Sequence, residues 1–448
     1  MIQGKAASSS KPSYLPPLAP RRPAIPAPLA GTTSTNPTDL FLAPYFQAHK
    51  IVPARAVEDR MYARRAYMDV LGLLPTPAQL AEFQADSSAD KRSRLVATLL
   101  ANNQAYAENW MSFWDDALRN DYQGTGYIDG GRKQITAWLY KSLATNMPYD
   151  QFVRQLVAAA PGAEGFTNGI LWRGAVSASQ RPELQAAQGI SQVFLGINMK
   201  CASCHDSFIN DWRLADSYGL AAVYAGSGSL DIFRCEKPTG KTASARFIYP
   251  QLGSIDASDP KPARMKRLAD LITSPQNGRL TRTIVNRLWQ RFMGRGVVEP
   301  ADDMDKEPWD IDLLDFLASD LADHHYDLKQ TIALILTSRA YQMPAIGESD
   351  VAEGSFVFHG PTVRRMSAEQ FRDAVATVTG IWPSKAAKAA TPVHAAVKAG
   401  PADLRDSKVR AVWTTRDAIM NAMGRPNREQ VVTSRITQAT MLQALELR

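Results

Sequence analysis

Apolar residues in the first half of the chain recur every three or four positions, which is the spacing of amphipathic α-helices. The pattern begins at Arg55, and the segment "RAVEDRMYARRAYMDVLGLL" ends at the breaker "PTP", after which Thr76 and Pro77 open the next helix. Polar positions separate the apolar ones, so each helix should bury one face. The spacing predicts helices over residues 55–74, 78–86, 91–103, 105–120, 130–146 and 147–160.

The helical spacing returns in the second half of the chain. Asp310 and Asp327 stand where a helix start needs a side-chain acceptor, and Gly294 stands where a helix should stop. Between the two halves lie many turn formers, and the clearest strand candidate there is "SARFIYP" at residues 244–250. The second half is predicted to form helices over residues 263–274, 279–294, 310–325, 327–342 and 367–380.

These elements predict a mainly α fold with two helical domains joined by a loop-rich connector with little β structure. Residues 1–45 are rich in Pro, Ala, Ser and Thr, and we expect a disordered tail or tether there. The predicted domains span residues 46–230 and 263–448, with the connector at 231–262. Because the chain stops inside a helical pattern, we expect the natural C-terminal domain to continue further.

The net charge of +7 does not point to nucleic acid, because most of it lies in the N-terminal tail. The first 55 positions contain one acidic residue, Asp39. They contain six basic residues: Lys5, Lys11, Arg21, Arg22, Lys50 and Arg55. The rest of the chain is close to neutral and has no lysine or arginine block. We therefore expect no nucleic-acid partner.

The strongest chemical signal is "CASCH" at residues 201–205, a CxxCH motif. Two thiols three positions apart can add to the two vinyl groups of a haem, and the adjacent histidine can reach the iron. The motif therefore predicts that Cys201 and Cys204 bind haem c covalently and that His205 is the metal ligand. A distal ligand would have to come from elsewhere, and weak candidates are His324, His325, Met304, His359 and Met343.

Three other interpretations of the motif stay open. Cys235, the third cysteine of the chain, could join Cys201, Cys204 and His205 as a Cys₃His zinc site. The cysteines could also be buried and inert. A redox CxxC pair is less favoured, because no thioredoxin-like βαβ pattern surrounds the motif.

The segments around the motif resemble the planctomycete-type cytochrome c-like domain family. The resemblance rests on "MDVLGLLPTPAQLAEFQAD", "FWDDALRNDYQGTGY" and "FLGINMKCASCHDSFINDWRLADSYGLAAVYAG". Further along, "RLTRTIVNRLWQRFMGRGVVEPADDM", "RRMSAEQFRDAV" and "GRPNREQVVT" resemble the companion C-terminal domain of unknown function. The resemblance covers most of residues 50–448 and implies an exported protein with haem at the motif. Many members read CxxCHxH, whereas this chain has Ser207 at the position of the second histidine.

Two charged clusters could carry other chemistry. Asp115, Asp116, Arg119 and Asp121 lie close together in sequence, with Arg132 nearby, and Asp116 and Asp121 could act as the acid and base of a glycan hydrolase. An ion-paired helix face is the more ordinary interpretation. Around Trp289, three arginines could grip an anionic group or pair with acids across a domain interface: Arg287, Arg291 and Arg295.

The sequence thus predicts a c-type haem-binding protein for electron transfer or haem-linked oxidoreduction, with an unidentified redox partner protein. The alternative is a non-redox protein for cell-surface or polysaccharide handling, whose Cys/His motif binds zinc or is structural. No apolar run approaches the roughly eighteen residues of a membrane span, and the N-terminus has no apolar core of a secretory signal. Covalent haem attachment and the resemblance nevertheless predict a periplasmic or other extracytoplasmic location.

Overall fold

The computed structural model describes residues 16–31, 34–128, 132–174, 176–347, 356–382 and 409–435. Its first half is built from short and medium helices, as the apolar spacing predicted. The α-helices of this half are α1 (Pro37–Ala48), α2 (Asp59–Leu71), α3 (Pro77–Ala85), α4 (Lys91–Ala101), α5 (Asn103–Leu118), α6 (Thr136–Ala144), α7 (Tyr149–Val157), α8 (Gly165–Asn168), α9 (Pro182–Leu195) and α10 (Leu214–Ala221).

The second half adds further helices after a two-stranded hairpin. They are α11 (Lys261–Ile272), α12 (Gly278–Met293), α13 (Ile311–Asp323), α14 (Leu328–Thr337), α15 (Arg339–Gln342), α16 (Ala368–Thr379) and α18 (Ala418–Ala422). Single 3-10 turns lie at η1 (Ala178–Gln180), η2 (Cys201–Ser203), η3 (Ala222–Tyr224), η4 (Pro250–Leu252) and η7 (Ala411–Trp413). The mainly α fold class is therefore confirmed.

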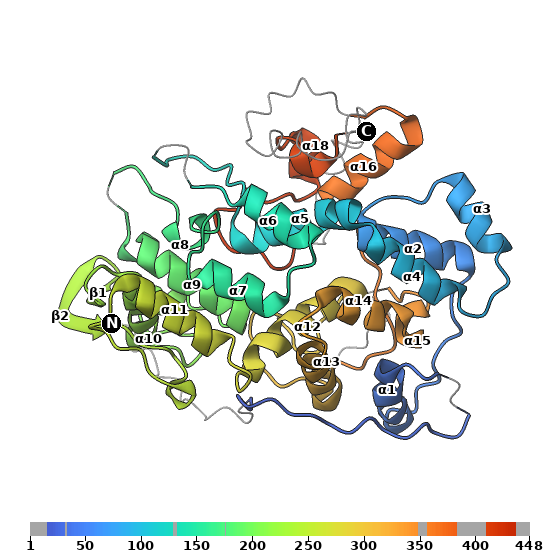
Figure 1. Cartoon of the computed structure of the whole chain (residues 1–448), viewed down its shortest axis with the longest axis horizontal. Helices are drawn as coiled ribbons and strands as arrows, with labels where there is room; N and C mark the ends of the chain where they lie inside the picture. Colours follow the sequence, from blue (N-terminus) through green and yellow to red (C-terminus); the bar gives the residue numbers. More distant parts are fainter. Residues whose placement is uncertain are drawn as a thin grey trace, which may run out of the picture.

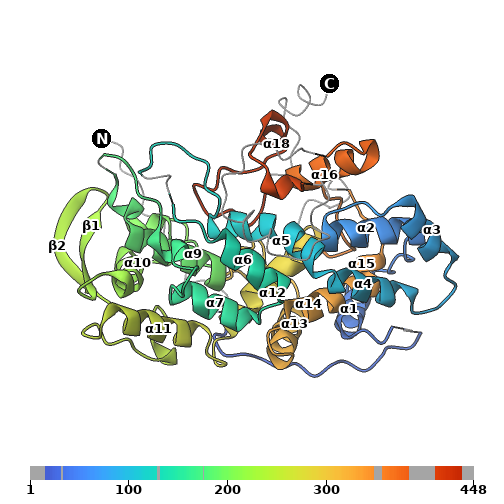
Figure 2. The ribbon, with the colours of Figure 1, turned by 45° about the horizontal axis from the view of Figure 1, so that its top comes forward.

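Helix α12 occupies the centre of the molecule (Figure 1) and packs against α9, α13 and α14. Trp289 and Phe292 on this helix are fully buried. One continuous cluster of buried hydrophobic side chains runs from Phe41 to Val412 and includes residues of both halves of the chain. Helices α16 and α18 lie above α5 in the turned view (Figure 2), on the side away from α13.

Local sequence signals explain where several helices begin and end. The Thr76 side chain accepts from the Gln79 backbone, and the Gln79 side chain closes the capping box. The carboxylates of Asp310 and Asp327 accept from backbone N–H groups of the first turns of α13 and α14. Gly294 ends α12 with φ of 85°, a left-handed conformation that suits glycine. The predicted helix starts at Asp310 and Asp327 and the stop at Gly294 are therefore confirmed.

The N-terminal segment differs from the composition-based expectation. Residues 37–45, assigned above to the tail, form most of α1, which Asn36 caps by accepting from the Thr38 backbone. The extended stretch before it is held by Arg282, whose guanidinium donates to the backbone carbonyls of Pro17 and Ala19. The composition of this segment predicted disorder because few apolar side chains could be buried, but it carries no information on hydrogen bonds made by the backbone. The expectation for residues 1–15 lies outside the described residues.

The strand prediction at residues 244–250 is wrong. The hairpin instead pairs β1 (Ser229–Arg234) with β2 (Lys237–Ser244) in antiparallel register. Strand β2 is almost wholly exposed, so it lacks the apolar alternation that marks a half-buried strand. The apolar residues after it serve the core, where Ala245 and Phe247 are buried.

Candidate functional site

The CxxCH motif forms a single turn on the surface of the first half. Cys201 opens the 3-10 turn η2, and its carbonyl accepts from the backbone N–H groups of both Cys204 and His205 at 3.0 Å. Ala202 and Ser203 are buried beneath the turn, whereas both cysteines are partly exposed. Gln188 on α9 fixes the turn by donating to the Ser203 hydroxyl at 2.6 Å. The motif is thus anchored from below, and both of its cysteines are partly accessible to solvent.

Cys235 lies beside this turn, at the tip of the hairpin. Its backbone N–H donates to the Cys204 carbonyl at 2.7 Å, and its thiol is in hydrogen-bonding contact with the Cys204 thiol. Burial, and then this contact, raise the pKa of Cys204 above its usual value. All three cysteines are free thiols. The structure therefore brings Cys235 to the motif, as the zinc interpretation required of it.

The zinc interpretation also required the other ligands to converge. Among the described residues, which include all four candidate ligands, no three His, Cys, Asp or Glu side chains are grouped so that they could hold a metal ion. The structure thus pairs Cys204 with Cys235 and assembles no larger ligand set in the part of the chain that it describes.

The imidazole of His205 is oriented by the backbone of the next residue. Its Nδ1 lies 2.7 Å from the Asp206 carbonyl, which fixes a proton on that nitrogen and leaves the lone pair on Nε2. The ring packs against Phe208 at 4.6 Å between centroids. Phe208 and Ile209 are 84% and 68% exposed, so an apolar surface continues directly from the histidine.

The candidates for a distal ligand are engaged elsewhere. Met304 is buried, and its sulfur accepts from Asn286. Met343 is buried near Gly360. His324 ends α13, where its Nδ1 lies 2.9 Å from the Asp320 carbonyl, and His325 follows it with φ of 55°. His359 is exposed. Among the described residues, no hydrogen bond or ion pair joins these side chains to the CxxCH turn.

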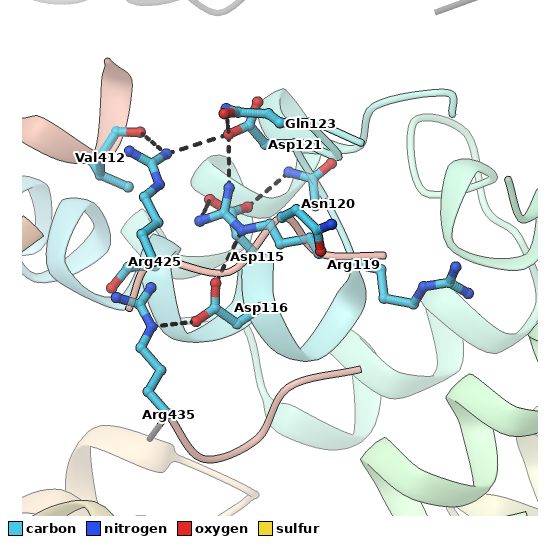
Figure 3. Close-up of polar contacts among 12 residues, drawn as sticks. Asp115, Asp116, Arg119, Asn120, Asp121, Gln123, Val412, Arg425 and Arg435 are labelled. Atoms are coloured by element: carbon cyan, nitrogen blue, oxygen red, sulfur yellow. Dashed lines mark hydrogen bonds and ion pairs between the residues drawn. The ribbon is translucent and has the colours of Figure 1, made fainter. Parts of the chain in front are cut away.

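The acidic cluster of α5 is an ion-pair network. Asp116 accepts from Arg428 at 3.0 Å and from Arg435 at 2.7 Å, so each of its carboxylate oxygens contacts an arginine (Figure 3). Asp121 accepts from Arg428 at 2.7 Å, and Arg425 lies 3.4 Å away. The ion-paired interpretation of this helix face is therefore confirmed.

Asp115 is the most enclosed carboxylate of this network. It accepts from Asn120 at 2.8 Å and lies 3.8 Å from Arg428. Burial raises its pKa to about 6.

The two arginines that sequence proximity suggested as partners point elsewhere. Arg119 donates to Gln185 on α9, away from the acids (Figure 3). Arg132 donates to the backbone carbonyls of Gly165, Phe166 and Arg119. Their place beside the carboxylates is taken by arginines from about three hundred positions further along the chain.

Two family models match the chain, one after the other. The first, PSCyt2, described as a protein of unknown function (DUF1549), matches residues 37–228. The second, PSD1, described as a protein of unknown function (DUF1553), matches residues 264–448. The chain therefore belongs to the PSCyt2 family over residues 37–228 and to the PSD1 family over residues 264–448. No curated protein and no solved structure matches it.

The match confirms the resemblance found in the sequence, and the name PSCyt2 points to a cytochrome-like domain. The CxxCH turn lies in the PSCyt2 segment, whereas Cys235 lies between the two matched segments. The ion-pair network joins both families, because its acids on α5 belong to PSCyt2 and its arginines belong to PSD1.

Sequence reasoning missed the basic half of this network and one of its acids. Glu369 of α16 receives two hydrogen bonds from Arg435 at 2.6 and 3.0 Å, and Arg425 lies 3.4 Å from it. These ion pairs hold the pKa of Glu369 well below its usual range despite its burial. The segment "GRPNREQVVT" carries Arg425 and Arg428, but nothing in its spacing indicates which carboxylates it meets.

The arginines around Trp289 have divided roles. Arg287 pairs with Asp302 at 3.0 Å and donates to the backbone carbonyls of Gln192 and Val193 on α9. It therefore joins α12 of PSD1 to PSCyt2 through backbone carbonyls, whereas its acidic partner, Asp302, lies in the PSD1 segment itself and not across the interface. Arg291 and Arg295 stack on aromatic rings.

Among the residues that the structure describes, no helix is both long enough and apolar enough to cross a membrane.

Proposed function

We propose that Cys201 and Cys204 attach a haem c covalently, that His205 is its axial ligand, and that the protein serves electron transfer or a haem-linked oxidoreduction. One observation carries the proposal. Two free thiols lie on one hydrogen-bonded turn, and the next residue is a histidine whose Nε2 keeps its lone pair. This is the donor set that a c-type haem uses.

The surroundings of the turn fit such a group. Because its Nδ1 faces the Asp206 carbonyl, His205 is held in the tautomer that binds a metal through Nε2. Phe208 and Ile209 offer exposed apolar side chains next to it. A large apolar macrocycle needs such contacts to be shielded from water. When bound, the haem would supply one-electron transfer, and the chain would supply the thioether anchors and the imidazole.

The proposal includes a location and a partner. Haem attachment to CxxCH takes place outside the cytoplasm, so we infer that the protein acts in the periplasm or another extracytoplasmic compartment. An electron carrier needs a second redox protein, which we expect to dock at the exposed surface around the motif.

The contact between Cys204 and Cys235 favours a second candidate function. In an oxidising compartment the two neighbouring thiols could form a disulfide, and Cys204 would then not be available to a haem vinyl group. The motif would then be structural, or would bind zinc if the thiols stay reduced, in a non-redox protein that handles cell-surface or polysaccharide ligands. The two candidates make opposite demands on Cys235.

Intact mass measurement of exported protein separates them. The chain is expressed with an export signal beside a cytochrome-maturation system, and its denatured mass and visible spectrum are recorded. Haem attachment predicts one added haem mass and a Soret band that survives denaturation. Cys204→Ser should lose the second thioether and destabilise attachment, whereas the matched control Cys235→Ser should keep the haem.

The second candidate predicts different results from the same samples. Colourless protein that lacks the mass of two hydrogens, with the deficit abolished in both Cys204→Ser and Cys235→Ser, would establish a disulfide and refute haem attachment. Stoichiometric zinc in colourless protein, lost in Cys201→Ser, would refute it in favour of a metal site.

A further inference from the structure

A cavity of about 390 Å³ lies where the PSCyt2 and PSD1 segments meet, away from the CxxCH turn. Helix α5 contributes Ser112, Phe113 and Asp116 to its wall. Helix α12 and the segments 364–370 and 423–435 contribute most of the remaining sides, together with Asp69 of α2 and Glu299. Its volume falls within the range of small-molecule sites.

Arginine dominates the charged lining of this cavity. Five arginines and three acids line it: Arg287, Arg291, Arg364, Arg365 and Arg435, with Asp69, Asp116 and Glu299. Three of the arginines have acidic partners. Arg364 binds Asp69 through two hydrogen bonds of 2.8 and 2.7 Å, and Arg435 and Arg287 form the ion pairs described above.

Arg291 differs from these three. Its guanidinium forms no hydrogen bond or ion pair with any residue that the structure describes, although its backbone carbonyl accepts from Arg364. It lies over the ring of Trp110 at 4.7 Å and near that of Phe113 at 5.5 Å, so one of its faces is held by aromatic rings. Burial lowers its pKa to about 10, which still leaves it charged at neutral pH.

Asp69 and Asp116 act on the charge of Arg291, but neither forms a hydrogen bond or ion pair with it. A fixed, partly buried guanidinium that is bonded to no acid among the described residues is a ready site for an anion, because it offers planar paired donors to carboxylate, sulfate or phosphate. Besides the charged residues, the wall contains uncharged hydroxyl and amide side chains: Ser112, Gln290, Ser367, Gln370, Thr433 and Ser434. Such groups match the hydroxyls of a sugar. Apolar contact comes from Phe113 and Met423.

We propose that this cavity binds a small polyhydroxylated anion, such as a sugar acid or a sugar sulfate, with Arg291 gripping its anionic group. The site uses residues of both families, so it exists only when the two segments are assembled. It is independent of haem attachment, because no CxxCH residue lines the cavity.

The test is calorimetric titration of the full chain with sodium glucuronate, glucose sulfate, glucose and inorganic sulfate. We expect one of the two charged sugars to bind and neutral glucose not to bind. Arg291→Gln should weaken that binding by about tenfold or more, since a charge-assisted hydrogen bond is lost. Arg295→Gln is the matched control, because Arg295 stacks on Phe356 at 4.3 Å and does not line the cavity.

Several outcomes would overturn the inference. The inference is wrong if neither charged sugar binds, or if glucose binds as tightly as the charged sugars. It is also wrong if the Arg291→Gln variant binds as tightly as the native chain. If inorganic sulfate competes as well as the sugars do, the cavity is a simple anion site. Arg291→Lys is a second variant that keeps the test valid if the Arg291→Gln variant does not fold. It keeps the charge without the planar fork, so it should retain an intermediate affinity.

Discussion

Arg428 is the hub of the buried network, and replacing it by methionine is the sharpest test of how the two halves are held together. Its side chain is 1% exposed and faces three carboxylates of α5 and the turn after it: Asp115, Asp116 and Asp121. Methionine fills similar space without charge. Arg428→Met would therefore leave Asp115 and Asp116 with less compensating charge and little access to solvent.

The expected cost follows from that burial. Breaking a buried ion pair by removing one partner costs about 3–5 kcal/mol, because the other charge stays desolvated. Asp116 keeps Arg435 at 2.7 Å, and Asp121 is about one-third exposed, which limits the loss. We therefore expect Arg428→Met to lower the free energy of unfolding by about 3 kcal/mol.

The assay is urea unfolding followed by tryptophan fluorescence, with Arg372→Met as the control. Arg372 also pairs with an acid, Asp417 at 2.5 Å, but both side chains are about one-third exposed, so its loss should cost under about 1 kcal/mol. Adding Asp116→Asn to Arg428→Met should recover part of the loss, since it removes an uncompensated charge. If Arg428→Met costs no more than Arg372→Met, the network does not stabilise the fold as argued.

Three further substitutions test other features. Gly196 has φ of 61°, and a Cβ at this position would overlap Met304. Gly196→Ala should therefore lower the free energy of unfolding, measured in urea, by about 1–3 kcal/mol. An unchanged midpoint would show that the structure tolerates a Cβ next to Met304. Asp327 caps α14, and Asp327→Ala should lower the melting temperature through a loss of about 1 kcal/mol, whereas Asp327→Asn should keep most of the cap. Burial raises the pKa of Asp115 from 3.8 to about 6, so the folded chain holds this proton more tightly than the unfolded chain; the resulting stability is present below about pH 4 and is lost as pH rises to about 6. Asp115→Asn should therefore remove a pH-dependent change of up to about 3 kcal/mol between pH 4 and 7, and identical pH profiles for both proteins would contradict this.

Features with local causes were predictable from the sequence. The starts of α13 and α14 depend on one carboxylate and the N–H groups two or three residues later, and the end of α12 depends on one glycine. Burial of Trp110 and Trp114 likewise follows from their spacing on one face of α5. In each of these cases, the residues that determine the feature lie within a few positions of one another in the sequence.

Features with distant causes were not predictable. Strand β2 is recognised by its pairing with β1, because its own side chains are exposed and polar. Asp116 and Arg428 lie 312 positions apart, and a single sequence does not record which charges meet across that distance. For the CxxCH turn, spacing predicted the cluster of groups, but the contact between Cys204 and Cys235 depends on where the hairpin folds back.

The charges shared between α5 and residues 425–435 have a consequence for how this architecture can change. A gene rearrangement that replaced one half with that of a distant relative would import acids or bases without their counterparts. Mismatched hybrids would carry bare charge in their interior, a cost of several kcal/mol, and would be removed by quality control. The two halves should therefore be inherited together. A hybrid made in the laboratory should fold only when its arginines and the aspartates that they pair with come from the same parent protein.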